Sequence, residues 1–327
     1  MSKTESSPIY YKGTCTLKEL MELPESSAPS YLVNQLIPEF GISYLYGHPG
    51  MGKTWVVLEI ARAVASGDKF VGQIDVKQGN VLIIDEESGI WQMRQRCKLL
   101  GFSKNLPLNF LSQNGFKLDN PSWIDEIVQY IMDNNIKCLI LDPFAAVHDC
   151  EENSSSEMQK VMTALQQLAL AGCSVIFVHH SRKGIGTSGQ NTRGSSAILG
   201  RADSAISIDG KTLDGINTII LQQEKNRCGP KSEPIKLFLI QNEDDKGLTL
   251  EYGGHSDKNI LKVDTAKTFC LKILNEESLP RMILQERIVR ESKCGVRNAG
   301  EAIRLLVSEQ KIVYDTKNGK REYKLVH

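Results

Sequence analysis

Residues 47–54 combine glycines, a lysine and a hydroxyl at the spacing that binds the phosphates of a nucleotide. They are, in order, Gly47, His48, Pro49, Gly50, Met51, Gly52, Lys53 and Thr54, and they match the pattern G-x-x-x-x-G-K-[ST]. Glycines let backbone N–H groups close around phosphate oxygens, the Lys53 ammonium can reach the β- and γ-phosphates, and the Thr54 hydroxyl can ligate Mg²⁺. The segment therefore predicts a site for ATP and Mg²⁺, with Lys53 as a catalytic cation.

The residues on either side supply the elements that this loop needs. Residues 41–46 (GISYLY) are apolar and partly β-branched, as in a buried parallel strand, and residues 55–66 (WVVLEIARAVAS) place apolar side chains at helical spacing. A strand, a glycine-rich turn and a helix thus follow in order, and the helix N-terminus adds its positive dipole end. This context disfavours the alternative, a glycine turn that matches by chance.

Two further apolar segments end in carboxylates. Residues 80–87 (NVLIIDEE) end in Asp85, Glu86 and Glu87, and the segment KCLILD closes on Asp142. A carboxylate beside the γ-phosphate can accept a proton or orient water, and Asp142 is suited to hold Mg²⁺ through a water molecule. Ligands of parallel sheets bind at the carboxyl ends of the strands, so we expect these groups near the loop. A solvated acidic turn is the alternative for the first group.

A third apolar segment, residues 174–180 (SVIFVHH), ends in His179 and His180. A polar group at this position can sense whether hydrolysis has occurred and move the loop that follows. The two histidines could instead bind a metal ion, but no third ligand stands at metal-site spacing. We therefore expect a sensor at the end of this strand.

The loop that follows is cationic. It contains Arg182, Lys183 and Arg193 together with three glycines, and no acidic residue between 182 and 193. Such a loop suits a moving contact with the phosphates of single-stranded DNA. A surface loop without a special role is the alternative.

A second pair of cations lies in residues 224–230 (EKNRCGP). Lys225 and Arg227 are separated by one residue and point to the same side of an extended segment. They could neutralise charge on a phosphate, either in the same subunit or as an arginine finger in a neighbouring subunit. Plain surface charge is the alternative.

Length and composition indicate an ordinary globular protein. The 327 residues are 41% hydrophobic and 24% charged, enough for one large α/β domain and a small second one. The eight cysteines form no C-x-x-C pair, which favours a reducing compartment. No apolar run approaches the roughly 20 residues that span a bilayer, and the N-terminus lacks a signal-peptide core. We expect a cytoplasmic protein with no membrane partner.

Strand and helix patterns alternate from residue 41 to about residue 250, which predicts an α/β fold with a mainly parallel, twisted sheet covered by helices. Strands are expected at 42–46, 80–85, 108–111, 137–142, 174–179, 204–208, 217–223 and 235–240. The predicted divisions are an N-terminal arm (1–38), an ATPase core (39–252), a linker (253–263) and a small C-terminal domain (264–327).

The C-terminal segment reads as three helices followed by a hairpin around Asn318-Gly319, the pattern of a winged helix. Residues 265–327 contain 13 Lys and Arg against 8 Asp and Glu, although the whole chain has a formal net charge of zero. The third helix and the wing would offer DNA a polar surface made of Arg297, Asn298, Arg304, Lys317, Lys320 and Arg321. A winged helix used for protein contacts or as a lid is the alternative.

These motifs together resemble the RecA/DnaB class of P-loop ATPases, and more narrowly the RepA-type (AAA-family) plasmid replicative helicases. The resemblance covers residues 25–250 and rests on VLIIDEE, LILDPFAAVH, VIFVHHSRKG and RGSSAILGRAD, which occur in the same order. It implies a RecA-like fold, with Glu87 in the place of the catalytic glutamate and His179 or His180 in that of the sensor.

The segment EKNRCGP is similar to the K-x-R finger motif of DnaB-like and RadA-like proteins. This resemblance implies that Lys225 and Arg227 act across a subunit interface, in a ring or filament and most commonly a homohexamer. The chain departs from RepA-type helicases after RGSS, where Arg201 and then Asp203 stand in a different register. Arg201 therefore stays an alternative finger.

The sequence as a whole predicts a homo-oligomeric, Mg²⁺-ATP-dependent DNA motor, specifically a replicative-type helicase of a plasmid, phage or mobile element. One alternative is an ATP-controlled oligomeric switch that binds duplex DNA through its winged helix without unwinding it. Another is an ATPase that binds protein partners without DNA.

Overall fold

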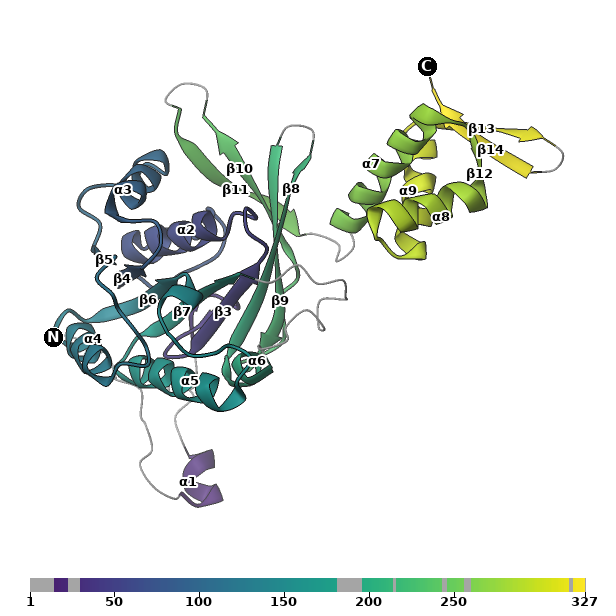
Figure 1. Cartoon of the computed structure of the whole chain (residues 1–327). Helices are drawn as coiled ribbons and strands as arrows, with labels where there is room; N and C mark the ends of the chain where they lie inside the picture. The colour runs from purple at the N-terminus through teal and green to yellow at the C-terminus, as the bar shows by residue number, and fades with distance from the viewer. Residues whose placement is uncertain are drawn as a thin grey trace. The chain divides into compact units, whose positions relative to one another are not determined.

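The computed structural model describes residues 15–22, 30–180, 196–213, 216–242, 246–255, 260–317 and 320–326 (Figure 1). The chain divides into two compact units, residues 1–255 and 256–327.

The described part of the first unit is built on a nine-stranded sheet in the order β11-β10-β9-β8-β3-β7-β6-β4-β5. Its strands are β3 (Ile42–Gly47), β4 (Asn80–Asp85), β5 (Leu108–Ser112), β6 (Ile136–Asp142), β7 (Ser174–His180), β8 (Ser204–Leu213), β9 (Ile216–Asn226), β10 (Ile235–Gln241) and β11 (Leu248–His255). The strands from β8 to β5 are parallel, whereas β9, β10 and β11 extend the sheet in antiparallel fashion. The predicted mainly parallel sheet is confirmed.

Helices cover both faces of this sheet (Figure 1). The helices are α2 (Lys53–Ser66), α3 (Ile90–Leu99), α4 (Pro121–Asp133), η2 (Phe144–Ala146), α5 (Ser155–Leu170) and α6 (Ser196–Arg201). Side chains alternate along each strand, so on β3 Leu45 packs in the core beside α2, while Tyr44 and Tyr46 pack in the core beside α4 and α5. Each face of the sheet is thus covered by a buried apolar core, as the sequence pattern of buried strands predicted.

The helix α4 shows why these segments become helical. Asn120 caps its N-terminus by accepting a hydrogen bond from the backbone N–H of Ser122, and Pro121 occupies its first turn. Ile124, Ile127 and Ile131 recur at helical spacing and are buried against the sheet.

Residues 30–38, predicted to belong to an arm, pack into the first unit instead. They form β1 (Tyr31–Val33) and β2 (Ile37–Pro38), with their apolar side chains in the core. The Gln223 side chain on β9 donates hydrogen bonds to the carbonyl oxygen of Gln35, at 2.8 Å, and to the Ser204 hydroxyl, at 3.1 Å. This buried network ties the turn between β1 and β2 to the main sheet. The short helix α1 (Leu17–Met21) precedes it and has no buried residue.

The strand β11 was not predicted, because its two glycines read as the start of a linker. It runs to His255 and pairs with β10, so that a Cβ on Gly253 would lie 2.8 Å from the Phe238 ring. Gly253 therefore lets the Phe238 ring lie close against β11 and does not mark a chain break.

The second unit contains, among its described residues, α7 (Ile260–Glu276), α8 (Arg281–Ser292) and α9 (Val296–Ser308) with the antiparallel sheet β12-β14-β13. The strands are β12 (Leu279–Pro280), β13 (Ile312–Lys317) and β14 (Lys320–Leu325). Helix α7 begins inside the range predicted as linker. On α9, Arg297 and Arg304 are exposed, but Asn298 is only 9% exposed, because it lies beside Ala299 and Ala302 on the buried face. The expectation that Asn298 faces outward is wrong.

None of the helices in the described ranges is long and apolar enough to span a lipid bilayer.

Candidate active site

The glycine-rich loop lies between β3 and α2 and is pressed against the neighbouring strands. Gly50 and Gly52 adopt left-handed backbone conformations, with φ of 80° and 84°. A Cβ on Gly47 would lie 2.1 Å from the carbonyl oxygen of Ile208, and one on Gly52 would lie 2.4 Å from the Ile219 side chain. The glycines therefore leave room for β8 and β9 as well as for phosphate.

Lys53 is buried at the start of α2 and holds its ammonium over the loop. Its Nζ donates hydrogen bonds to the carbonyl oxygens of Gly47, at 2.9 Å, and His48, at 2.8 Å. Burial lowers the pKa of Lys53, while the charges of Asp142 and Glu87 oppose this shift. The site thus presents a desolvated cation, positioned by the backbone, to an incoming anion.

Asp142, at the end of β6, meets Thr54 although 88 positions separate them in the sequence. The Thr54 hydroxyl donates a hydrogen bond of 2.9 Å to Asp142 Oδ2. Burial raises the pKa of Asp142 to about 6, and the Thr54 hydrogen bond acts in the opposite direction. A hydroxyl and a carboxylate are hard oxygen donors, which Mg²⁺ prefers together with substrate phosphates. These two side chains therefore fit a magnesium ion.

The three acidic residues after β4 have different surroundings. The Asp85 carboxylate accepts backbone N–H groups of the next turn, at 3.0 and 2.9 Å. The Glu86 carboxylate accepts those of residues 114–116, at 3.2, 3.1 and 3.1 Å. Glu87 is exposed, and its charge raises the pKa of Lys53. Because the Asp85 and Glu86 carboxylates accept hydrogen bonds from backbone N–H groups, Glu87 is the carboxylate available to orient water.

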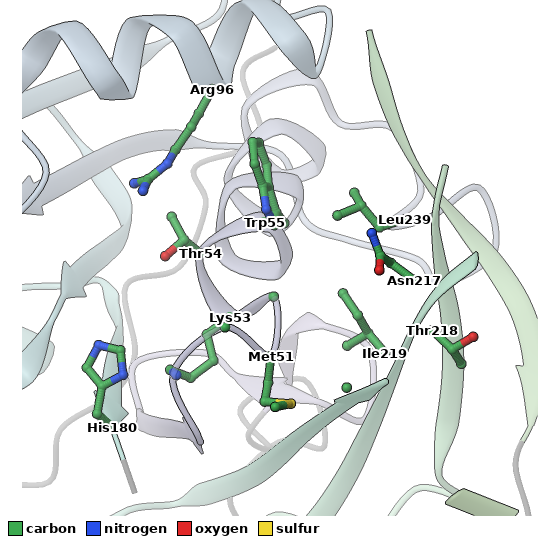
Figure 2. Close-up of a pocket in the computed structure, with 13 residues that line it drawn as sticks. Met51, Lys53, Thr54, Trp55, Arg96, His180, Asn217, Thr218, Ile219 and Leu239 are labelled. Carbon is green, nitrogen blue, oxygen red and sulfur yellow. The ribbon is translucent and has the colours of Figure 1, made fainter. Parts of the chain in front are cut away.

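The two histidines at the end of β7 face opposite sides of the sheet. His179 Nε2 lies 3.0 Å from Glu152 Oε1, and its ring contacts Phe144. His180 faces the loop, where burial and then the Lys53 charge lower its pKa (Figure 2). Within the described ranges, no three His, Cys, Asp or Glu side chains are grouped so that they could hold a metal ion. Because His180 faces the loop and His179 faces the other side of the sheet, His180 is the histidine placed to contact a phosphate.

A pocket of about 490 Å³ opens above the loop (Figure 2). It is lined by Gly50, Met51, Gly52, Lys53, Thr54, Trp55, Arg96, His180, Gly210, Asn217, Thr218, Ile219 and Leu239. This size is in the range of small-molecule sites. His180 Nδ1 is buried and, like His179 Nδ1, has no hydrogen-bond partner among the described residues. The pocket therefore fits a nucleoside triphosphate.

Sequence reasoning missed Arg96, whose side chain extends from α3 into this pocket (Figure 2). Its Nη1 donates a hydrogen bond of 2.8 Å to the Ser88 hydroxyl. Only its place on a helix after the acidic strand could have suggested it. The contribution of β9 and β10 to the pocket was also missed, because no local motif marks it.

Lys225 and Arg227 lie far from this pocket. Lys225 Nζ donates hydrogen bonds to the carbonyl oxygens of Leu199, at 2.6 Å, and Gly200, at 2.9 Å. Arg227 pairs with Asp203 at 3.3 Å, and the Asp203 N–H in turn binds the Ile42 carbonyl at the start of β3.

The two cations thus cap the C-terminus of α6 at the amino ends of the parallel strands. The phosphate loop begins at the opposite end of β3, roughly 17 Å along the strand. The geometry rules out action on the phosphate of the same subunit. Arg201 is at this edge too, where its Nη1 donates a hydrogen bond of 3.1 Å to the Thr163 hydroxyl on α5.

The structure describes only some of the residues that are predicted to contact DNA. Arg182, Lys183 and Arg193 lie outside the described residues, and Lys320 is described in its backbone alone. Arg297 and Arg304 are exposed on α9, where Arg304 pairs with Glu301.

The raised pKa of Asp142 predicts how its replacement affects stability. The folded chain holds a proton on Asp142 up to a pH of about 6, against 3.8 for an ordinary carboxyl, so stability falls as pH rises through this window. We expect Asp142→Asn to raise the free energy of unfolding of the metal-free protein at pH 8, by at most about 3 kcal/mol, and to raise it less at pH 5.

Thermal unfolding in a metal chelator measures this effect. The exposed Asp125 provides a control, since Asp125→Asn should change the unfolding free energy by less than about 0.5 kcal/mol at either pH. A lower melting temperature of Asp142→Asn at pH 8 would contradict the prediction.

Comparison with known families agrees with this geometry. A family model described as an AAA domain matches residues 18–186, slightly more than half of the 327 residues. The matched part contains the phosphate loop and the ends of β4, β6 and β7, whereas β8 to β11 and the second unit lie beyond it. The chain therefore belongs to the AAA domain family, and its site is that of a P-loop nucleoside triphosphatase.

Proposed function

We propose that this protein is a homo-oligomeric, Mg²⁺-ATP-dependent DNA motor, a replicative-type helicase of a plasmid, phage or mobile element. The observation that carries the proposal is the position of Lys225 and Arg227 at the edge of the sheet opposite the phosphate loop. At that edge the cations are useful to hydrolysis only in the site of a neighbouring copy. A ring of six copies would place each pair against the next subunit's phosphates.

The residues around the pocket have different roles in hydrolysis. Lys53 holds the phosphates, and Thr54 and Asp142 hold Mg²⁺, which supplies positive charge that offsets the charge of the phosphate oxygens. Glu87 accepts a proton from water as the water oxygen bonds to the γ-phosphorus and the bridging oxygen leaves with ADP. His180 contacts the γ-phosphate and is followed directly by the cationic loop.

DNA binding is the further step. The sensor strand β7 runs into residues 181–195, so a change at His180 would be passed to Arg182 and Lys183, and single-stranded DNA would bind there. The second unit, with three helices and a β13–β14 hairpin, supports a winged helix. Its Arg297 and Arg304, seven positions apart on one face of α9, suit the phosphates of duplex DNA.

Glu87 and Glu86 form a matched pair for testing the base. We expect Glu87→Gln to lower kcat by about 10²- to 10⁴-fold while ATP binding persists, because only the proton acceptor is lost. Glu86→Gln should instead lower stability, by about 1–3 kcal/mol, since it weakens three backbone hydrogen bonds, and should leave kcat within about tenfold. Steady-state hydrolysis and thermal unfolding measure both. A larger kcat loss for Glu86→Gln would assign the base to Glu86.

Mixing two inactive variants tests the finger. Lys53→Ala and Arg227→Ala are each expected to lower hydrolysis by about 10³-fold or more. In a mixed oligomer, an Arg227→Ala subunit keeps its own phosphate loop and receives Arg227 from a Lys53→Ala neighbour, so hydrolysis should return on mixing.

The same experiment with Arg201→Ala decides between the two candidate fingers. Light scattering confirms that the variants assemble. If assembled mixtures of Lys53→Ala with Arg227→Ala stay inactive, a finger at Arg227 is contradicted. If hydrolysis returns only in mixtures of Lys53→Ala with Arg201→Ala, the finger is Arg201.

Charge reversal separates the motor from the alternative, an ATP-controlled switch that binds duplex DNA without unwinding it. Arg182→Glu, Lys183→Glu and Arg193→Glu combined should abolish the stimulation of hydrolysis by single-stranded DNA and leave duplex binding within about threefold, because each phosphate contact contributes separately. Arg297→Glu with Arg304→Glu should weaken duplex binding alone. If hydrolysis of the unaltered protein is indifferent to single-stranded DNA, the motor proposal fails and the switch is favoured.

A further inference from the structure

The pocket has two chemically different ends. Lys53 and His180 lie at one end, close to Glu87 and to the Thr54–Asp142 pair, and the charges there suit the γ-phosphate and its metal ion. The other end is formed by Trp55, Asn217 and Leu239, which converge from α2, β9 and β10 (Figure 2). This difference favours a triphosphate bound with its terminal phosphate toward His180.

The second end is an apolar wall. Trp55 and Leu239 are partly buried side chains that pack against the core of this face, and Ile219 beside them is only 3% exposed. None of these groups carries a charge, so the wall offers nothing to a phosphate. It suits the flat, apolar face of an aromatic ring.

We propose that this wall is the nucleobase subsite and that the Trp55 indole stacks on the base. The inference rests on the proposed nucleotide function and names the residues that distinguish a nucleotide from a bare polyphosphate. Ile219 and Leu239 close the subsite from the side of the sheet, and the Asn217 amide, which can donate and accept hydrogen bonds, lies at its rim.

The position of Trp55 supports this assignment. It follows the Lys53-Thr54 pair directly on α2 and lines the same pocket, so a nucleotide whose phosphates lie on the loop has Trp55 next to it. The strands β9 and β10 that complete the subsite are outside the residues matched by the family model. Base recognition would therefore depend on β9 and β10, the strands that extend the parallel sheet in antiparallel fashion.

Calorimetric titration of the full chain with ATP and with inorganic tripolyphosphate tests the proposal. Base stacking on an aromatic side chain contributes about 1–3 kcal/mol, so we expect Trp55→Ala to weaken ATP binding by about tenfold or more. Tripolyphosphate, which has no base, should bind the variant within about twofold of the unaltered protein. Trp55→Phe should keep most of the ATP affinity. Trp91 is 72% exposed and lies outside the pocket, so Trp91→Phe should change the affinity for neither ATP nor tripolyphosphate.

A fluorescence measurement keeps the test decisive if Trp55→Ala does not fold. The chain has three tryptophans, and a Trp91→Phe, Trp123→Phe double variant retains Trp55 alone. Saturating ATP should quench its emission, while tripolyphosphate should not. Unchanged emission with ATP, or equal weakening of both ligands by Trp55→Ala, would overturn the subsite.

The outcome for the unaltered protein separates this inference from the proposed function. If it binds ATP with a Lys53-dependent affinity and Trp55→Ala binds ATP equally well, only the subsite assignment fails. If it binds neither ATP nor tripolyphosphate, the nucleotide function fails and the subsite fails with it.

Discussion

The site depends on holding Lys53 and Asp142, two groups of opposite charge, out of water at one edge of the sheet. Lys53 satisfies its ammonium with two loop carbonyls, and Asp142 accepts the Thr54 hydroxyl. Burial still disfavours both charges, as the lowered pKa of Lys53 and the raised pKa of Asp142 indicate. The free protein therefore retains a local electrostatic cost that an anion on the loop and a cation beside Asp142 would relieve.

The sheet gives the molecule two functional edges. Its parallel strands bring Asp85, Asp142 and His180 to the carboxyl edge, while Lys225 and Arg227 lie at the amino edge. The strand β9 connects them, since Asn217 lines the pocket at one of its ends and Lys225 lies near the other. In the proposed oligomer, this strand would link the nucleoside end of one site with the finger that serves the next.

Much of the fold could be predicted from local pattern. The strands β3 to β10 were recognised because apolar runs of the right length end in turn residues or carboxylates, and parallel pairing follows from their alternation with helices. Two parts were not. Residues 30–38 follow a polar N-terminal segment and are anchored to the sheet by Gln223, almost 190 positions away, and on β11 Gly253 leaves room for the Phe238 ring. Both depend on long-range contacts that no local window contains.

The sequence by itself determined which residue types could bind and hydrolyse a nucleotide, because the loop pattern and the strand-ending acids are local features. Only the tertiary structure distinguished the two histidines, since His179 turns away while His180 faces the phosphate loop, and it showed that Glu86 binds backbone N–H groups whereas Glu87, which the resemblance already favoured, is exposed. It also excluded action of Arg227 within its own subunit. The physical reason is that strand register and packing fix the direction and the edge of each side chain, and these arise from contacts between segments far apart in the sequence.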